Sequence, residues 1–367
     1  MSLFKSQKHI LGVDLGVSSI KVVELAQANK GAELVTYGFA KFRADDIKKD
    51  SALEQEKIAA ILKKICKEAK VSAVNAIASL PPFFVFTSII NLPQMLSQDI
   101  EAAVKWEAKK VIPLPLDQIE LKWKAININQ CQGKDSEKNE NNQKEKQGKK
   151  MQILLTGAAK KIVQRYMNIF KTAGLNLYSL ETESFALSRS LLNEKENSVA
   201  MVVDIGALNT NIAIIKSGIP FLNKSIDVGA LTISKSIANS LNINIERAEQ
   251  FQYDIGITIN NKDQAIPKII EESLAAIVNE IKYSFNLYEE YKGTILSPDD
   301  RIEKIVLCGG GVIIPNLAEY LSGLLNIKVY IGDPWDKVKY NEELKLILQE
   351  IGPNFPVAVW LAMRDLH

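Results

Sequence analysis

The chain has 367 residues, which is enough for two or three domains of ~100–200 residues each. Lys and Arg together number 45 and Asp and Glu 43, so the charge balance gives no reason to expect nucleic acid or an anionic membrane surface as a partner. The three cysteines, Cys66, Cys131 and Cys308, show no metal-ligand or redox spacing, which is typical of a reducing cytosol.

The N-terminal region is predicted to form a hairpin. Asp14 interrupts the apolar run that follows Met1 to Lys8, which excludes a signal peptide, and no window of the chain approaches the ~18–20 apolar residues of a membrane span. Residues 10–25 form the hairpin, with Asp14-Leu15-Gly16 at its turn, and residues 33–42 a further strand. Apolar residues at helical spacing then predict an amphipathic helix over 51–69, followed by a strand over 74–80.

A small β-α-β-β module is predicted over residues 81–156. Its elements are a strand over 83–91, a helix capped by Ser97 and stopped by Pro113 and Pro115, and strands over 119–129 and 151–156. Trp106 and Trp123 are expected in its core unless they form an interface. The polar segment 133–150 is expected to be a disordered, solvated loop, because it has too little apolar surface to bury.

The remaining residues repeat the opening plan. A helix over 161–173 ends at Gly174, and the strand over 175–180 leads to a helix over 182–192. Val202 to Ile215 form a second hairpin whose turn again carries Asp-x-Gly, at Asp204 to Gly206. The later expected elements are a strand over 221–228, helices over 231–241, 245–253 and 266–291, a strand over 302–307, a turn at Gly309-Gly310-Gly311, a helix over 318–325, a strand over 328–331 and a closing helix over 355–363. Mixed elements in two similar halves predict an α/β protein.

The two Asp-x-Gly turns predict a nucleotide site. Glycine lets backbone N–H groups at the hairpin tips approach a phosphate closely, and the two Asp carboxylates are suited to hold Mg²⁺ through water. The residues assigned to phosphate contacts are Gly16, Ser18, Ser19, Lys21, Gly206, Asn209 and Thr210, and those assigned to the metal are Asp14 and Asp204. A single such hairpin is usually only a tight turn, but two at matching positions, with a glycine triplet after a third strand, favour nucleotide binding.

At these residues the chain resembles the superfamily of actin, sugar-kinase and heat-shock chaperone ATPases, and within it the PilM family of type IV pilus assembly, which is related to FtsA. The motifs that carry the family likeness are Ala78-Ser79-Leu80-Pro81, Ile90-Asn91-Leu92-Pro93, Trp106-Glu107-Ala108, Ile112-Pro113-Leu114-Pro115-Leu116-Asp117, Asp227-Val228-Gly229, Gly332-Asp333-Pro334 and Ala358-Val359-Trp360-Leu361-Ala362-Met363-Arg364. The resemblance implies a duplicated actin-like, ribonuclease H-like fold with two lobes around a nucleotide cleft. The first lobe would comprise residues 1–80, 157–200 and 340–367, the inserted subdomain 81–156, and the second lobe 201–339.

The resemblance also implies further site residues. Gly309, Gly310 and Gly311 would lie against the adenosine, and Glu249 and Gln252 would correspond to the family's Ala-Glu-x-x-Lys motif. Gln252 replaces the motif's lysine with a neutral amide, which puts that nucleotide contact in doubt. Glu183 falls at the position that orients the attacking water, although a helix-start carboxylate exposed to solvent is an equally good interpretation. Trp360 stands where the family usually has a small residue.

The role that the resemblance implies is a cytoplasmic adaptor that binds ATP and Mg²⁺ and grips the N-terminal cytoplasmic tail of the membrane protein PilN. It would join the inner-membrane pilus platform through such partners, with no membrane span of its own and no nucleic acid. The tail would lie in a groove near Pro93 to Leu116, although a proline-flanked apolar helix is more often core. The resemblance leaves two questions open at this point: whether ATP is hydrolysed slowly or not at all, and whether the chain self-associates.

Two alternatives remain. An FtsA-like division protein that forms filaments on the membrane should carry an amphipathic membrane helix after its last core helix, whereas the given sequence stops shortly after residues 358–363. A small-molecule kinase should carry a base near the substrate pocket of the first half, where only Asp45-Asp46 is available. Both alternatives are therefore less favoured than the adaptor.

Overall fold

The first sheet is built around the N-terminal hairpin. The computed structural model describes residues 8–29, 31–42, 51–126, 150–192, 198–257, 265–292 and 297–366. The order of strands in this sheet is β14-β3-β2-β1-β4-β8, with β1, β2 and β3 forming an antiparallel meander and β4 and β8 running parallel to β1. Its strands are β1 (His9–Leu15), β2 (Ser19–Gln27), β3 (Ala32–Lys41), β4 (Asn75–Leu80), β8 (Asn176–Thr182) and β14 (Val338–Lys339).

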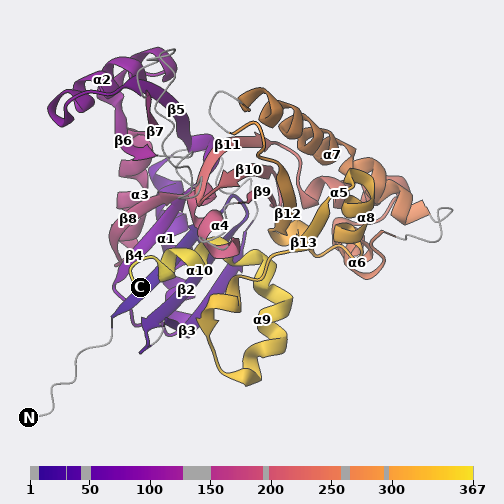
Figure 1. The fold of residues 1–367 in the computed structure, drawn as a ribbon. Coiled ribbons are helices and arrows are strands. Elements are labelled where there is room, and N and C mark those ends of the chain that lie inside the picture. Colours follow the sequence, from indigo (N-terminus) through magenta and orange to yellow (C-terminus); the bar gives the residue numbers. More distant parts are fainter. Residues whose placement is uncertain are drawn as a thin grey trace, which may run out of the picture.

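Helices cover both faces of this sheet, and together they form the first lobe (Figure 1). The helices α1 (Ala52–Glu68) and α3 (Lys160–Ala173) pack on one face, while α4 (Glu183–Leu191) and α10 (Pro356–Met363) pack on the other. Gly174 ends α3 with a left-handed backbone conformation, as its position in the sequence predicts.

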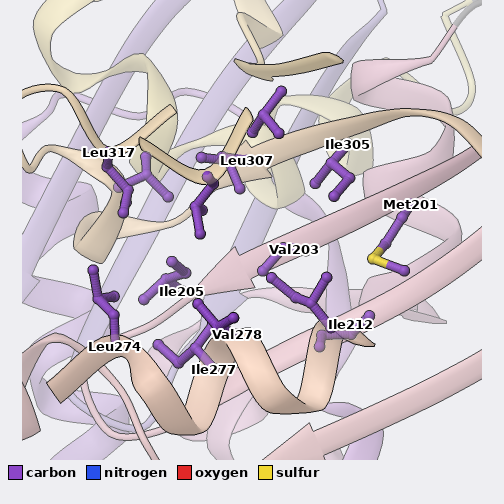
Figure 2. Packing of buried hydrophobic residues seen from close by; sticks show 14 of the residues in the cluster. Met201, Val203, Ile205, Ile212, Leu274, Ile277, Val278, Ile305, Leu307 and Leu317 are labelled. Carbon is purple, nitrogen blue, oxygen red and sulfur yellow. The ribbon is translucent and has the colours of Figure 1, made fainter. Parts of the chain in front are cut away.

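The second lobe repeats this plan around a second hairpin. Its sheet has the order β11-β10-β9-β12-β13, and the strands are β9 (Val199–Ile205), β10 (Thr210–Lys216), β11 (Ile219–Ile226), β12 (Ile302–Cys308) and β13 (Lys328–Ile331). Its helices are α5 (Ala230–Leu241), α6 (Ile245–Asp254), α7 (Ala265–Tyr291) and α8 (Leu317–Leu325). In Figure 2, Val203 and Ile205 of β9 lie between Leu274 and Ile277 of α7 and Leu307 of β12, and these side chains are buried.

A third, smaller sheet forms the inserted module (Figure 1). Its elements follow one another along the chain as β5 (Val85–Pro93), α2 (Ser97–Val111), β6 (Ile119–Ile126) and β7 (Lys150–Ala159), and the strand order is β5-β7-β6. This confirms the β-α-β-β order expected from the sequence. The predicted disordered loop 133–150 lies outside the described residues, apart from Lys150 at the start of β7.

The orientation of α2 differs from the expectation. Val104 and Ala108 face the small sheet and are fully buried, whereas Trp106 is 63% exposed and Trp123 of β6 is 39% exposed, so the core placement of these two tryptophans is wrong. Trp106 stands two residues from each buried position, which puts it on the opposite side of a helix with 3.6 residues per turn. Ser97 is the first residue of α2 and does not cap it, because the preceding position is Leu96 and no side chain accepts a hydrogen bond there.

The C-terminal helix α10 is the centre of the first lobe. All eight of its residues are buried, and Gly12 on β1 lies directly under it, because a side chain at Gly12 would meet the carbonyl of Ala358. Trp360 is also buried, and the guanidinium of Arg189 lies over its ring at 5.5 Å. The helix α9 (Lys345–Ile351), which precedes α10, was not predicted from the sequence.

Among the described residues, no single helix has both the length and the apolar composition to cross a membrane. Two consecutive segments, Glu342–Asn354 and Pro356–Met363, meet those criteria only when they are taken together, with a bend of 101° between them.

The close packing of α10 on β1 gives a stability prediction. A Cβ at Gly12 would lie 2.6 Å from the backbone nitrogen of Ala362, so Gly12→Ala forces α10 away from the sheet and should lower the free energy of unfolding by about 3 kcal/mol. Gly323→Ala is the control, since Gly323 lies within α8 with open space around it, and alanine there should raise stability by about 0.5–1 kcal/mol. Urea unfolding measures both values, and equal stabilities of the two variants would contradict this account of α10.

Candidate functional site

The first hairpin positions Asp14 next to Lys21. These two residues are directly opposite one another in the register of β1 and β2, and Lys21 Nζ lies 2.9 Å from Asp14 Oδ2. The hydroxyl of Ser79 on β4 donates a hydrogen bond to Asp14 Oδ1 at 3.4 Å. Asp14 is 6% exposed, so the sheet holds this carboxylate in a nearly buried position.

The second hairpin has a turn that is held from two sides. Gly206 N–H donates to the carbonyl of Asn209 across the turn, and the N–H groups of Ala230 and Leu231 at the start of α5 donate to the carbonyls of Gly206 and Ala207, each at 2.9 Å. Gly229 has no room for a side chain, because a Cβ there would lie 2.6 Å from the Gly206 carbonyl oxygen. The start of α5 therefore fixes the shape of the turn that carries Asp204.

Glu183, at the start of α4, is hydrogen-bonded to the second hairpin. Its side chain is 7% exposed, so the interpretation of Glu183 as an exposed helix-start carboxylate is wrong. Asn211 Nδ2 donates to Glu183 Oε2 at 3.4 Å, and the hydroxyl of Ser225 donates to Asn211 Oδ1 at 2.8 Å. Neither Asn211 nor Ser225 was predicted from the sequence, although Asn211 is the polar residue that interrupts the apolar run of β10 and pairs with Asp204.

Electrostatic interactions show that Asp14, Asp204, Glu183 and Lys21 form one cluster. Burial raises the pKa of Asp204 to about 6, with Lys21 opposing the shift and Asp14 adding to it. Burial, and then the charges of Asp14 and Asp204, raise the pKa of Glu183 well above its usual value. For Lys21, burial alone would lower the pKa, but the charge of Asp14 and its hydrogen bond, followed by Asp204 and Glu183, raise it. Three carboxylates thus share one ammonium group.

The glycine triplet lies against the second hairpin. Gly309 follows β12 with φ of 89°, and a Cβ there would collide with Asp204 Oδ1 and would lie 2.5 Å from the carbonyl oxygen of Ile205. Gly311 packs on the side chain of Ile205, and Gly310 faces Asn354, where a Cβ would lie 2.8 Å from Oδ1. Only glycine at residue 309 allows both the positive φ and this approach to the carboxylate.

Two predicted nucleotide contacts have other partners in the structure. Thr210 is fully buried, and its hydroxyl donates to the carbonyl of Val228 at 2.7 Å. Gln252 is 1% exposed, and its Oε1 accepts a hydrogen bond from the hydroxyl of Ser234 at 2.7 Å, inside the contact between α5 and α6. Glu249 on α6 is half-buried. Ser18, Ser19 and Asn209 are half-buried at the two hairpin tips, where the prediction places them.

The carboxylates fit a hydrated cation better than a tightly enclosed one. Among the described residues, no three His, Cys, Asp or Glu side chains are arranged to hold a metal ion directly. The excess negative charge of the cluster nevertheless favours a divalent cation, and Mg²⁺ typically keeps several waters and takes only one or two carboxylates from the protein. The residues present are therefore compatible with Mg²⁺ held by Asp14 and Asp204.

A large apolar groove lies on the other side of the first hairpin. Its volume is about 750 Å³, and its walls come from the first hairpin, the helices α1 and α3, the inserted module and the tip of the second hairpin. Lining residues that represent these walls are Val17, Ile58, Tyr166, Phe84, Leu114 and Leu208. Of the segment Pro93 to Leu116, where the sequence places the partner groove, Ile112, Pro113 and Leu114 reach this groove.

Comparison with known proteins gives one family and a set of related structures. A family model described as type IV pilus assembly protein PilM matches residues 12–366. A solved structure of a PilM-PilN type IV pilus biogenesis complex is similar, with a TM-score of 0.78 and 23% identity, covering 98% of both chains. MreB5 of Spiroplasma citri bound to ADP has a TM-score of 0.50 and 14% identity, covering 89% of this chain and 92% of that one. A MamK double helical filament has a TM-score of 0.52 and 13% identity, covering 97% and 98%. These likenesses show an actin-like ATPase fold, as the sequence predicts.

The raised pKa of Asp204 predicts a dependence of stability on pH. The folded protein binds this proton with a pKa of about 6, against an unperturbed value of 3.8, so stability should rise as the pH falls from 7 through 6 toward 4. Asp204→Asn removes this contribution and should raise the free energy of unfolding at pH 7 by about 3 kcal/mol. The measurement is urea unfolding from pH 4.5 to 7.5 in EDTA without nucleotide, with the exposed Asp117→Asn as control. If the difference in free energy of unfolding between Asp204→Asn and the wild type does not change with pH, the pKa of Asp204 is not raised in the folded protein.

Proposed function

Because the chain belongs to the family of the type IV pilus assembly protein PilM, we propose that it is an ATP-binding adaptor that docks the cytoplasmic tail of a PilN protein in its apolar groove. The observation that carries the nucleotide part of the proposal is the convergence of Asp14, Asp204 and Glu183 at the mouths of two matching hairpins. The observation that supports the partner is the groove itself, together with the similarity of the chain to a PilM that forms a complex with PilN.

The nucleotide would lie between the two hairpins. Backbone N–H groups at the tips around Gly16, Ser18, Ser19, Gly206 and Asn209 would receive the phosphates, and Gly309 to Gly311 would lie beside the adenosine. Mg²⁺ held near Asp14 and Asp204 would supply positive charge to the phosphates. Lys21 keeps its proton at neutral pH and would neutralise Asp14 or a phosphate. The bound ADP in the similar MreB5 supports nucleotide binding in this fold.

Thr210 and Gln252 contribute to this site through the fold. Thr210 fixes β10 to the segment before α5, and Gln252 fixes α6 to α5 through Ser234. Glu249 projects from the same helix as Gln252 and would contact the ribose or the base. We propose that Glu183 orients a water near the terminal phosphate, since Asn211 holds its carboxylate beside the two aspartates. No feature of this cluster of residues demands rapid hydrolysis of ATP, so slow hydrolysis is compatible with the proposal.

The cellular role follows from the partner. A protein that holds the cytoplasmic tail of PilN would be cytoplasmic and would associate with the inner membrane and the other pilus platform proteins through that partner. The lobes would divide near the predicted boundaries, except that Val338 and Lys339 pair with β3 of the first sheet, so the chain would return to the first lobe before residue 340. The similar MamK filament makes self-association a natural extension of the proposal.

The alternatives have less support. The family match over residues 12–366 favours PilM over an FtsA-like division protein. A small-molecule kinase would need a catalytic base near the first hairpin, but Asp45 and Asp46, which the sequence offers there, lie outside the described residues.

The nucleotide assignment predicts the behaviour of Asp204→Ala. Removing the carboxylate that would hold Mg²⁺ should weaken Mg-ATP binding at least ~30-fold, because a charged group that serves the metal contributes at least ~2 kcal/mol. Isothermal titration calorimetry measures the affinity, and circular dichroism checks that the variant is folded. Asp117→Ala, at an exposed position outside the cluster, should bind as the wild type does. Unchanged affinity of Asp204→Ala for Mg-ATP would refute the placement of the nucleotide.

The partner assignment predicts the effect of a charge in the groove. Leu114 lines the groove, so Leu114→Asp should weaken binding of a synthetic PilN tail peptide at least ~10-fold by burying an unpaired carboxylate. The matched control is Leu96→Asp, which changes a leucine of the same module that is 67% exposed and does not line the groove. Fluorescence anisotropy of the labelled peptide measures both. Equal affinities of the two variants, or no binding by the wild type at high micromolar concentration, would place the tail elsewhere.

A further inference from the structure

Positive charge is concentrated on two neighbouring helices of the first lobe, α1 and α3. Together they carry eight Lys and Arg but only three Glu, and α3 holds four of the cations and no carboxylate. One of the three glutamates, Glu54, is buried and completes the capping box with Ser51, so Glu56 and Glu68 are left to oppose the positive charge. The formal net charge of the whole chain is only +2, so the remaining sequence is net negative.

The helices of the second lobe have the opposite charge. The four helices α5 to α8 carry nine Asp and Glu against four Lys and Arg. The near balance of charge in the whole sequence therefore conceals an asymmetry between the helices of the two lobes. A protein with such an asymmetry takes a preferred orientation near a charged surface, because its basic side is attracted and its acidic side repelled.

The lysines of α1 lie on the side of the helix that faces solvent. Ile58, Leu62 and Ile65 are buried against the first sheet and α3. On the opposite side, exposed residues recur at alternating steps of four and three, which is the spacing of a single helix face. The residues of this stripe are Leu53, Lys57, Ala60, Lys64 and Lys67.

The exposed side of α3 continues this surface. Lys160, Lys161 and Lys171 are exposed, and α1 and α3 pack against one another in the same core. Between them Asn168 Nδ2 donates to Gln55 Oε1 at 3.5 Å. The two helices thus present one continuous basic face, which we call the α1–α3 face.

The same two helices form a wall of the apolar groove. Ile58 of α1 lines the groove, and so do Lys161 and Arg165 of α3. The α1–α3 face therefore begins at the rim of the groove. In the proposed function the groove holds the tail of a membrane protein, and that tail must run from the groove to the bilayer. The bilayer then lies on the side to which the groove opens, next to the α1–α3 face.

We propose, on the basis of the proposed function, that the α1–α3 face docks directly on the anionic phospholipids of the membrane that anchors the tail. Clusters of four to eight Lys and Arg on an amphipathic helix surface are typical of such docking. Leu53 is 62% exposed and Met167 is 51% exposed, so an apolar side chain stands beside the lysines on each helix and can enter the headgroup region. The acidic helices of the second lobe are repelled by the same surface, which fixes the orientation of the protein.

The test is flotation of the full chain with protein-free vesicles. Vesicles made of equal parts phosphatidylcholine and phosphatidylglycerol should bind the protein at least ~10-fold more strongly than vesicles of phosphatidylcholine alone. Binding to the mixed vesicles should weaken as salt is added, because salt screens the attraction between exposed charges. Equal binding to both kinds of vesicle would overturn the proposal.

A triple variant locates the docking face. Lys57→Gln, Lys67→Gln and Lys171→Gln together should weaken binding to the mixed vesicles at least ~20-fold, because each lysine close to an anionic surface contributes roughly 5-fold. None of these three lysines lines the groove, so the variant should bind a soluble PilN tail peptide as the wild type does. Circular dichroism checks that the variant is folded.

The matched control changes three exposed lysines of helices in the second lobe. Lys235→Gln, Lys268→Gln and Lys282→Gln together remove the same charge and should leave binding to the mixed vesicles unchanged or slightly stronger. An equal loss in the two triple variants would show attraction by net charge alone and would overturn the docking face. Tighter binding of a DNA duplex than of the mixed vesicles, lost in the α1–α3 variant, would assign the face to nucleic acid instead.

The peptide measurement separates this inference from the proposed function. If the wild type binds the tail peptide but not the mixed vesicles, the docking is refuted and the proposed function stands. If the wild type does not bind the peptide, the proposed function fails, and the docking fails with it because the groove no longer sets the side on which the membrane lies.

Discussion

The cluster of three carboxylates around one ammonium group is the constraint on which the candidate site depends. Asp14 comes from the first hairpin, Asp204 from the second and Glu183 from the helix that follows β8, and the single lysine lies in the register opposite Asp14. Burial and mutual repulsion raise the pKa values of Asp204 and Glu183, so the folded chain holds these groups at a cost. Two hydrogen bonds offset part of this cost, because Ser79 donates to Asp14 and Asn211 donates to Glu183. A cation is the natural complement to the remaining charge.

Backbone contacts keep the cluster in place. Gly309 lies against the Asp204 carboxylate and the Ile205 carbonyl, and Gly229 lies against the Gly206 carbonyl, so in both places the chain approaches too closely for any side chain. The parallel pairing of β12 with β9, which puts Cys308 beside Asp204, brings the glycine triplet to this position. The site is thus defined by close backbone packing on one hairpin, and the first hairpin supplies the counter-charge.

Local sequence patterns predicted most of this arrangement, and the failures have a common cause. Both hairpins, the β-α-β-β module and the glycine triplet follow from apolar periodicity and turn residues, which act over a few positions. The exposed Trp106, the buried Glu183 and the Ser234–Gln252 contact depend on which face of a helix meets another element, and a single element does not encode that. Asn211 and Ser225 were not predicted for the same reason. Their hydrogen bonds lead to Glu183, which lies elsewhere in the chain.

The polar groups of the second lobe serve mainly to keep its shape. The Thr210 hydroxyl donates to the Val228 carbonyl, and the Ser234 hydroxyl donates to the side-chain oxygen of Gln252. The Ser225 hydroxyl donates to Asn211, whose side-chain amide donates to Glu183. The pKa of Glu183 is raised by burial first and then by the charges of Asp14 and Asp204, so Asn211 holds this carboxylate in an environment that disfavours its charged form. In the proposed function the nucleotide would join the two hairpins whose tips, Val17 and Leu208 among them, also line the groove.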